Sequence, residues 1–267
     1  MVIQRILVLW VILVWLLVGG EAKAGLLSDR IANFPNWYDK PPVTAAKGDL
    51  VYPDWMEGNW QVSSTLIEQF APLAPEIVTP GFSDNEGYIN QNMTFQVRFQ
   101  AVTESFLNRS NRFLTFPMTI FKTDRSQNKV IVADRAFNGL NIGKAYLGDR
   151  AIRSIKVDPN SPNRQVTVLS TGHQLVSIVT DRATETPAPD RFIGTEMTNQ
   201  FFQGTSPPYF NQVETTTSYQ LISSPRLMVE ASQITAIYLS PQDPDYFKAL
   251  DKPVAMYRYK LELVPLE

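Results

Sequence analysis

Side chains suited to catalysis or metal binding are scarce in this chain. Cysteine is absent, and His173 is the single histidine. A zinc site draws its three or four ligands mainly from these two residue types, so the composition argues against zinc. Ser170 lies near His173, but the Gly-x-Ser-x-Gly pattern of serine hydrolases is absent, and Thr171-Gly172-His173 is typical of a turn between strands. We therefore predict no catalytic residue, no metal site and no cofactor.

Glycine-rich and acidic segments do not form a recognised site either. Residues 138–143 contain glycines typical of a loop but lack the phosphate-binding pattern G-x-x-x-x-G-K-[ST]. Any two carboxylates could meet in the fold as a glycosidase pair, and the sequence singles out no such pair. The net charge of −2 provides no basic field for nucleic acid. These features favour a non-enzymatic protein with no nucleic-acid partner.

Asp-Arg dipeptides are the most unusual compositional feature. They begin at positions 29, 124, 134, 149, 181 and 190. Neighbouring side chains of a strand point to opposite faces, so the two members of one dipeptide do not bond each other there. We expect each Asp to cap a turn and each Arg to cover the end of a strand.

The first 24 residues have the features of a secretory signal peptide. Arg5 precedes the unbroken apolar run Ile6 to Val18, and Ala22-Lys23-Ala24 has the small-x-small form of a cleavage site. The run is shorter than the roughly 20 residues that span a bilayer. We expect export with cleavage after Ala24, and an uncleaved anchor is the alternative.

From residue 58 onward, apolar side chains recur with the period of two that is typical of strands. Phe95, Val97 and Phe99 alternate with polar residues, and the last strand, Val254 to Val264, turns Tyr257 and Tyr259 to one face. About nine to ten such segments are separated by turn residues, with few helical patterns. The sequence therefore predicts an all-β, antiparallel barrel or sandwich over residues 58–267.

Three further segments give specific expectations. Lys129 to Phe137 is predicted as a strand, and Asp243 to Leu250 as a helix of two turns. Residues 25–57 form an N-terminal arm rich in proline and aromatic residues, which we expect to pack on the body. The loop 69–91 is too apolar to be freely solvated, so we expect it to cover an opening or an edge, either as passive packing or as a functional lid.

The start of the first strand, Gly58-Asn59-Trp60, resembles the Gly-x-Trp signature of lipocalins and related calycin barrels. That family adds a Thr-Asp turn motif, for which this chain offers Thr180-Asp181-Arg182 or Thr123-Asp124-Arg125, and a late arginine, here Arg258. The resemblance implies a calycin-like barrel in which Gly58 allows a tight approach, Trp60 closes the floor and Arg258 packs on Trp60.

A broader resemblance covers most of the chain after the leader. Residues 52–60 (Tyr-Pro-Asp-Trp-Met-Glu-Gly-Asn-Trp), Thr79-Pro-Gly-Phe82 and Tyr257-Arg-Tyr-Lys-Leu261 are similar to an uncharacterised, exported family of cyanobacteria and plastids. The resemblance implies a periplasmic or thylakoid-lumen location. It implies no particular activity.

An eight-stranded or larger barrel has an interior that can hold one small ligand. A flat apolar ligand such as a pigment, lipid or isoprenoid would suit the aromatic side chains of the predicted strands. The residues predicted to bind it are Trp60, Phe95, Phe99, Tyr219, Tyr257 and Tyr259. The same aromatic side chains equally suit a filled core.

An enzyme that uses carboxylates would require a cleft with an Asp or Glu of raised pKa, and two further functions remain open from the sequence. The first is a monomeric, non-enzymatic protein that binds a small hydrophobic ligand. The second is an interaction or assembly factor of a photosynthetic or envelope membrane complex, which would dock through residues 34–60 and the loop 69–91. An enclosed apolar cavity would favour the first, and a solid interior with an exposed apolar patch would favour the second.

Overall fold

The computed structural model describes residues 25–103, 129–204, 208–223 and 228–266. The expected signal peptide, residues 1–24, lies outside these ranges, as does the candidate motif Thr123-Asp124-Arg125. In the described part of the chain, no helix is long and apolar enough to cross a membrane.

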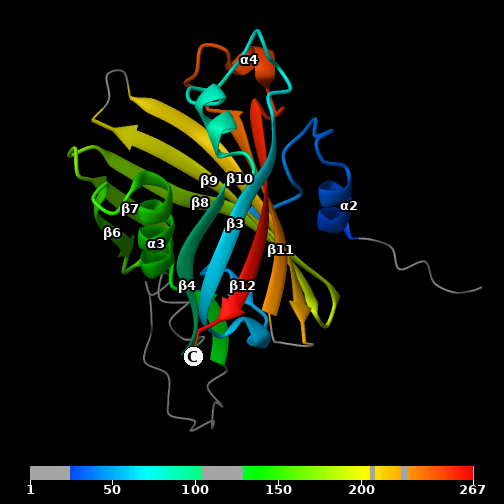
Figure 1. Cartoon of the computed structure of the whole chain (residues 1–267). Coiled ribbons are helices and arrows are strands. Elements are labelled where there is room, and N and C mark those ends of the chain that lie inside the picture. Colours follow the sequence, from blue (N-terminus) through cyan, green and yellow to red (C-terminus); the bar gives the residue numbers. More distant parts are fainter. Residues whose placement is uncertain (1–24, 104–128, 205–207, 224–227, 267) are drawn as a thin grey trace, which may run out of the picture.

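The fold is all-β and is built on one antiparallel sheet that curls into a half-barrel (Figure 1). Its strands are β1 (Thr44–Ala45), β2 (Val51–Tyr52), β3 (Gly58–Phe70), β4 (Asn92–Thr103), β5 (Lys129–Ala133), β6 (Ile152–Asp158), β7 (Ser161–Leu169), β8 (Gln174–Ala188), β9 (Arg191–Gln203), β10 (Tyr209–Ile222), β11 (Met228–Leu239) and β12 (Ala255–Pro265). Their order in the sheet is β2-β5-β4-β3-β12-β11-β10-β9-β8-β7-β6, and β1 pairs with β8. The curled sheet fits the predicted calycin-like barrel.

Within the described ranges, helices are few and short. They are α2 (Leu26–Ala32), α3 (Arg135–Leu147) and α4 (Tyr246–Ala249), with 3-10 turns at Asp54–Met56 and Ser83–Tyr88. The two-turn helix predicted for Asp243 to Leu250 is shorter than expected, because α4 spans only four residues before the chain turns at Leu250, where φ is +50°.

The alternation that predicts the long strands is seen clearly in β4. Val97 and Phe99 are buried on the concave side, whereas Gln96 and Gln100 are exposed. The last strand, β12, pairs with β3, so that Leu263 lies opposite Val62. One apolar cluster on the concave side therefore joins the first long strand to the last one.

Helix α3 corrects the strand predicted for Lys129 to Phe137. That strand ends at Ala133, because the Asp134 side chain accepts a hydrogen bond of 3.0 Å from the Phe137 N–H and caps the helix. α3 contacts both β4 and β6. It therefore lies across the opening of the half-barrel (Figure 1).

Two kinds of contact hold α3 in this opening. The side-chain amide of Asn138 bonds both the N–H and the C=O of Arg98, at 2.7 and 3.2 Å, and so continues the pairing of β4 where β5 stops. On the other side, Gly143 packs so closely on Ile152 that a Cβ there would clash with the Ile152 Cδ1. The glycines expected in a loop are thus in a helix, where they permit close packing.

The N-terminal arm packs on the convex face of the sheet, as expected. Trp37 is buried with Ile234, Tyr238 and Met256 of β11 and β12. Arg30 of α2 is buried in the same region and bonds Glu214 of β10. The arm therefore fills the outer face of these strands.

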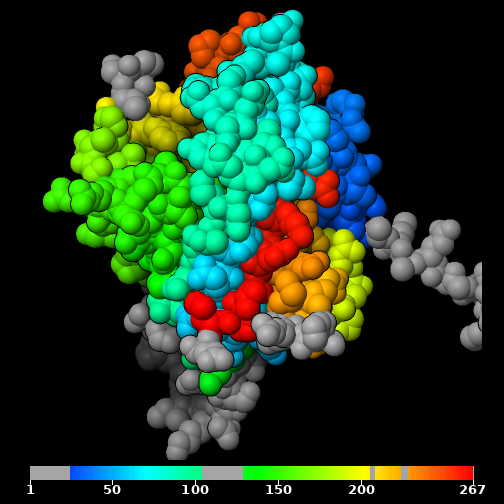
Figure 2. Space-filling model, viewed as in Figure 1, coloured from blue at the N-terminus to red at the C-terminus, as the bar shows by residue number. Residues whose placement is uncertain are grey.

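The loop after β3 covers one end of the half-barrel. Ile77 is buried against Leu239 and Val254, and the ring of Phe82 lies 5.9 Å from the ring of Tyr257. In Figure 2 this loop (cyan) and α4 (orange) lie together at one end of the molecule. The covering role expected of the loop is seen: Ile77 and Phe82 turn toward the body, whereas Val78 is 45 % exposed.

Candidate functional site

A cavity of about 410 Å³ lies between the concave face of the sheet and α3. Its walls are formed by Leu50, Tyr52, Val62, Ser64, Phe95, Val97, Phe99, Ala133, Asn138, Ile142, Tyr146, Gly194, Glu196, Thr215, Thr217, Tyr219, Gln233, Thr235, Tyr259, Leu261 and Leu263. The helix contributes Asn138, Ile142 and Tyr146, whose spacing of four places them on one helix face. α3 is thus one wall of the cavity as well as the closure of the barrel.

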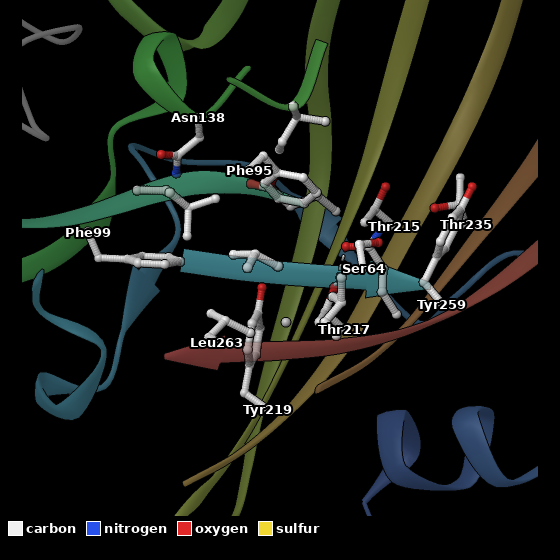
Figure 3. A pocket seen from close by; sticks show the side chains of 18 of the residues that line it. Ser64, Phe95, Phe99, Asn138, Thr215, Thr217, Tyr219, Thr235, Tyr259 and Leu263 are labelled. Atoms are coloured by element: carbon white, nitrogen blue, oxygen red, sulfur yellow. Dashed lines mark hydrogen bonds between the residues drawn. The ribbon is translucent and has the colours of Figure 1, made fainter. Parts of the chain in front are cut away.

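The cavity changes from apolar to polar along its length (Figure 3). Phe95, Phe99 and Leu263 lie toward one end of the view, and Thr215 and Thr235 lie toward the other. The strand register explains this change, because the positions of β10 that line the cavity pass from Tyr219 to Thr215, and Thr235 of β11 lies opposite Thr215. We call these two regions the apolar end and the hydroxyl end.

The hydroxyl end consists of two facing residue pairs on β10 and β11. Thr217 lies opposite Gln233, and Thr215 lies opposite Thr235. Thr217 donates a long hydrogen bond of 3.4 Å to the Gln233 side-chain oxygen. The Thr215 and Thr235 hydroxyls form no hydrogen bond with any residue that the structure describes. These two groups face the cavity with their donors and acceptors unused.

Tyrosine hydroxyls line the rest of the polar surface, and burial raises their pKa values. Burial raises the pKa of Tyr219 to about 12, and it raises the pKa of Tyr52 and Tyr259 above the usual value for tyrosine. Tyr146 shares a hydrogen bond of 3.0 Å with Ser64. All of these side chains are therefore neutral at physiological pH, and a neutral tyrosine hydroxyl can donate a hydrogen bond to a ligand oxygen.

The one charged side chain on the cavity wall in the described residues is Glu196, and two arginines neutralise it. Arg135 bonds Glu196 at 2.8 Å and Asp49 at 2.8 Å, and Arg182 bonds Glu196 at 2.9 Å. Burial alone would lower the pKa of Arg135, but Glu196 and Asp49 raise it above its ordinary value. Arg182 further bonds the Gly48 carbonyl at 3.0 Å. The cluster thus holds two cations and two anions.

Four of the six residues predicted to bind a ligand line this cavity: Phe95, Phe99, Tyr219 and Tyr259. Trp60 lies beneath it, 2 % exposed, and its ring N–H donates to the Met56 carbonyl at 2.9 Å. Tyr257 lies beyond the hydroxyl end, where it packs on the loop and accepts a hydrogen bond of 3.2 Å from Asn85. The structure therefore places these last two residues in the packed core around the cavity.

The expected contact between Arg258 and Trp60 is not formed. Trp60 lies opposite Pro265 in the pairing of β3 with β12, seven residues from Arg258. The Arg258 side chain points to the convex face, where it bonds Glu68 at 3.2 Å and lies 5.6 Å from the ring of Phe34. Gly58 does have a positive φ of +131°, which favours glycine as the chain enters β3 beside Trp60.

Sequence reasoning missed the polar half of the site. Glu196, Arg135 and Arg182 come from three separate elements, and only the folded sheet brings them together. The repeated Asp-Arg dipeptide was a partial signal, because Arg30, Arg135 and Arg182 all form buried ion pairs with glutamates distant in sequence. The prediction that these arginines cover strand ends therefore describes their role incompletely.

Comparison with known proteins identifies one family. The model of a domain of unknown function, DUF6816, matches residues 44–267, which include every residue of the cavity. No curated protein and no solved structure matches the chain. Among the described residues, no group of three or more His, Cys, Asp or Glu side chains is arranged to hold a metal ion.

Proposed function

The chain belongs to the DUF6816 family of domains of unknown function, and we propose that it is an exported, non-enzymatic protein that binds one small hydrophobic ligand inside its half-barrel. The observation that carries this proposal is the cavity of about 410 Å³ behind α3. Ligand pockets typically enclose about 300–1,000 Å³ and are mostly apolar with a few polar groups. The cavity has this size and this composition.

The packing around the cavity supports a ligand site over an incompletely filled core. Cores are normally packed to the density of organic crystals, with few voids larger than a water molecule. The clusters on either side of the cavity obey this rule, since Met56, Val229 and Ala255 are 0 % exposed. An open space between such well-packed regions is a specific feature of this fold, and its aromatic walls suit a pigment, a lipid or an isoprenoid.

The test is titration of the protein with the neutral dye N-phenyl-1-naphthylamine, which fluoresces strongly in apolar surroundings. We expect saturable binding of one dye molecule per chain. The variant Ala133→Phe adds a ring at the cavity wall and should abolish binding. Val264→Phe makes a comparable change at a position that is 48 % exposed and should leave binding unchanged. Absence of binding to the wild type, or equal binding by both variants, would reject the proposal.

The alternative, docking to a membrane complex, has one observation in its favour. Phe247 and Leu250, around α4, are 81 % and 54 % exposed, and they lie at the end of the molecule that carries the loop (Figure 2). Tyr38 of the arm and Val78 of the loop are also exposed, at 70 % and 45 %, whereas other apolar side chains of both segments turn toward the body. Loss of co-purification with a membrane complex in Phe247→Ser/Leu250→Ser, with dye binding retained, would favour this alternative.

The proposed location is the periplasm or the thylakoid lumen, in monomeric form. Mass spectrometry of the protein recovered from its native host measures where the chain begins. A mature N-terminus at Gly25 is the expected result. A chain that still begins at Met1 and sediments with membranes would contradict cleavage.

A further inference from the structure

We propose that the ligand is an uncharged amphiphile, with an apolar body and a hydroxyl or carbonyl group, and that the cavity rejects the corresponding carboxylate. This inference rests on the proposed function and adds the chemical class of the ligand. It combines two features of the cavity, the unused hydrogen-bonding groups at one end and the complete neutralisation of its charges.

The hydroxyl end supplies the recognition of a neutral oxygen. The side chains of Thr215, Thr217, Gln233 and Thr235 lie on adjacent strands, at two successive levels of the sheet. A threonine hydroxyl both donates and accepts, and a glutamine amide offers a donor and an acceptor side by side. A ligand alcohol needs one acceptor and one donor, and a ligand carbonyl needs only a donor. The hydroxyl end meets either requirement with uncharged side chains.

The apolar end fixes the orientation of such a ligand. Phe95, Phe99 and Leu263 surround the region farthest from Thr215 and Thr235 (Figure 3). Placing a polar group there would cost its hydrogen bonds to water with no replacement. The oxygen of an amphiphile should therefore lie at the hydroxyl end, and its hydrocarbon part should lie against the rings.

The electrostatics of the wall exclude a carboxylate. Among the described residues that line the cavity, none is Lys, Arg or His. The charges of the two arginines behind the wall are balanced, since Arg135 bonds Asp49 and Glu196 and Arg182 bonds Glu196. Arg182 also bonds the Gly48 carbonyl, and its Nε is buried without a partner in the described structure. A ligand carboxylate at the hydroxyl end would lie near Glu196, on the strand beside Thr215, with no cation to neutralise it. Burying an uncompensated charge is strongly unfavourable.

The first experiment compares two competitors that differ only in the end group. Decanol and decanoate are titrated at pH 7.5 against N-phenyl-1-naphthylamine bound to the wild-type protein. We expect decanol to displace the dye at a concentration at least about tenfold lower than decanoate, since burial of an unpaired charge costs more than the 1.4 kcal/mol that corresponds to tenfold. Equal displacement, stronger displacement by decanoate, or displacement by neither compound would overturn the inference.

Two variants locate the selectivity. Thr215→Val/Thr235→Val removes the unused hydroxyls while keeping the shape of the side chains, and should weaken decanol binding about tenfold once the dye affinity of the variant itself has been measured. Thr186→Val, the same change at an exposed position of β8, should have no effect. If the double variant and this control bind decanol equally, the hydroxyl end does not recognise the ligand.

The variant Glu196→Gln tests the charge argument separately. It removes one anion from the cluster and leaves Arg135 and Arg182 with an excess of positive charge. The affinity ratio of decanoate to decanol should rise about tenfold, and an unchanged ratio would contradict the charge argument. Dye binding separates the two proposals. If the protein binds the dye but does not distinguish decanol from decanoate, the proposed function stands and only this inference is rejected.

Discussion

The two faces of strands β9 to β11 use polar residues in opposite ways. On the convex face, Glu214 accepts hydrogen bonds from Arg30 at 2.7 Å, from Tyr238 at 2.7 Å and from Thr216 at 2.8 Å. Thr195 completes this network at 3.0 Å from Thr216. On the concave face, the neighbouring residues Thr215 and Thr235 form no such bonds in the described structure.

This difference separates stabilising polar groups from polar groups available to a ligand. The outer network is fully buried, with Glu214, Thr195 and Thr216 each 0 % exposed, and a satisfied network of this kind holds the arm to the sheet. The inner hydroxyls of Thr215 and Thr235 form no hydrogen bond within the described structure. Under the proposed function, they would bind the oxygen of a ligand.

The largest expected effect is on the outer face. Arg30→Met leaves the carboxylate of Glu214 buried without its cation, which should lower the free energy of unfolding by about 3–5 kcal/mol. Urea unfolding measures this change. Arg164→Met is the matched control, because the ion pair of Arg164 with Asp158 is long, at 3.5 Å, and half-exposed, and its loss should cost less than about 1 kcal/mol. Equal effects of the two variants would remove the stabilising role of the outer network.

The next largest effect concerns the helical wall of the cavity. Gly143→Leu forces a side chain into the space held by Ile152 and should lower the free energy of unfolding by about 1–3 kcal/mol. It should also weaken dye binding, because α3 must move away from β6. Gly87→Leu is the control, since nothing lies within 4 Å of a Cβ at that position. A stable Gly143→Leu protein with normal dye affinity would show that α3 is not a fixed wall.

A smaller effect should appear in alkaline solution. The pKa of Tyr219 is about 12 in the folded protein and near 10.0 in the unfolded chain. The unfolded state therefore loses this proton first, and stability present below pH 10 is lost progressively up to pH 12. Between pH 8 and pH 11, the free energy of unfolding of the wild type should therefore fall by about 1 kcal/mol more than that of Tyr219→Phe. Parallel stability curves for the two proteins would contradict a raised pKa of Tyr219.

The smallest effect is expected from the hydroxyl end. Thr215→Val/Thr235→Val breaks no hydrogen bond within the described protein, so its free energy of unfolding should stay within about 0.5 kcal/mol of the wild type. A loss of more than about 2 kcal/mol would mean that these hydroxyls stabilise the fold, and the contrast between the two faces would fail.

Local patterns in the sequence were sufficient to predict the long strands and four aromatic residues of the cavity wall. The alternation of Phe95, Val97 and Phe99 with polar residues correctly predicts that one face of β4 is buried. Helix α3 was missed because Asn138, Gly139 and Gly143 have low helix propensity, and tertiary packing on β4 and β6 outweighs that preference. The cap at Asp134 was the one local signal of a helix start.

The polar cluster could not be predicted from local patterns. Arg182 and Glu196 face each other across the hairpin of β8 and β9, but Arg135 comes from α3 and Asp49 from the N-terminal arm, and only the complete fold brings these four residues together. The alternation of β12 placed Arg258 on the face opposite Tyr259, which excludes the expected contact with Trp60. A family motif predicts which residues belong to a fold more reliably than which of them touch.

The most direct test of the two-face contrast is methyl NMR of the protein labelled at threonine, with decanol added. The account predicts chemical-shift changes at Thr215, Thr217 and Thr235, which line the cavity, and none at Thr195 and Thr216, on the opposite face of the same sheet. Equal changes on both faces, or changes confined to the outer threonines, would contradict an internal ligand site.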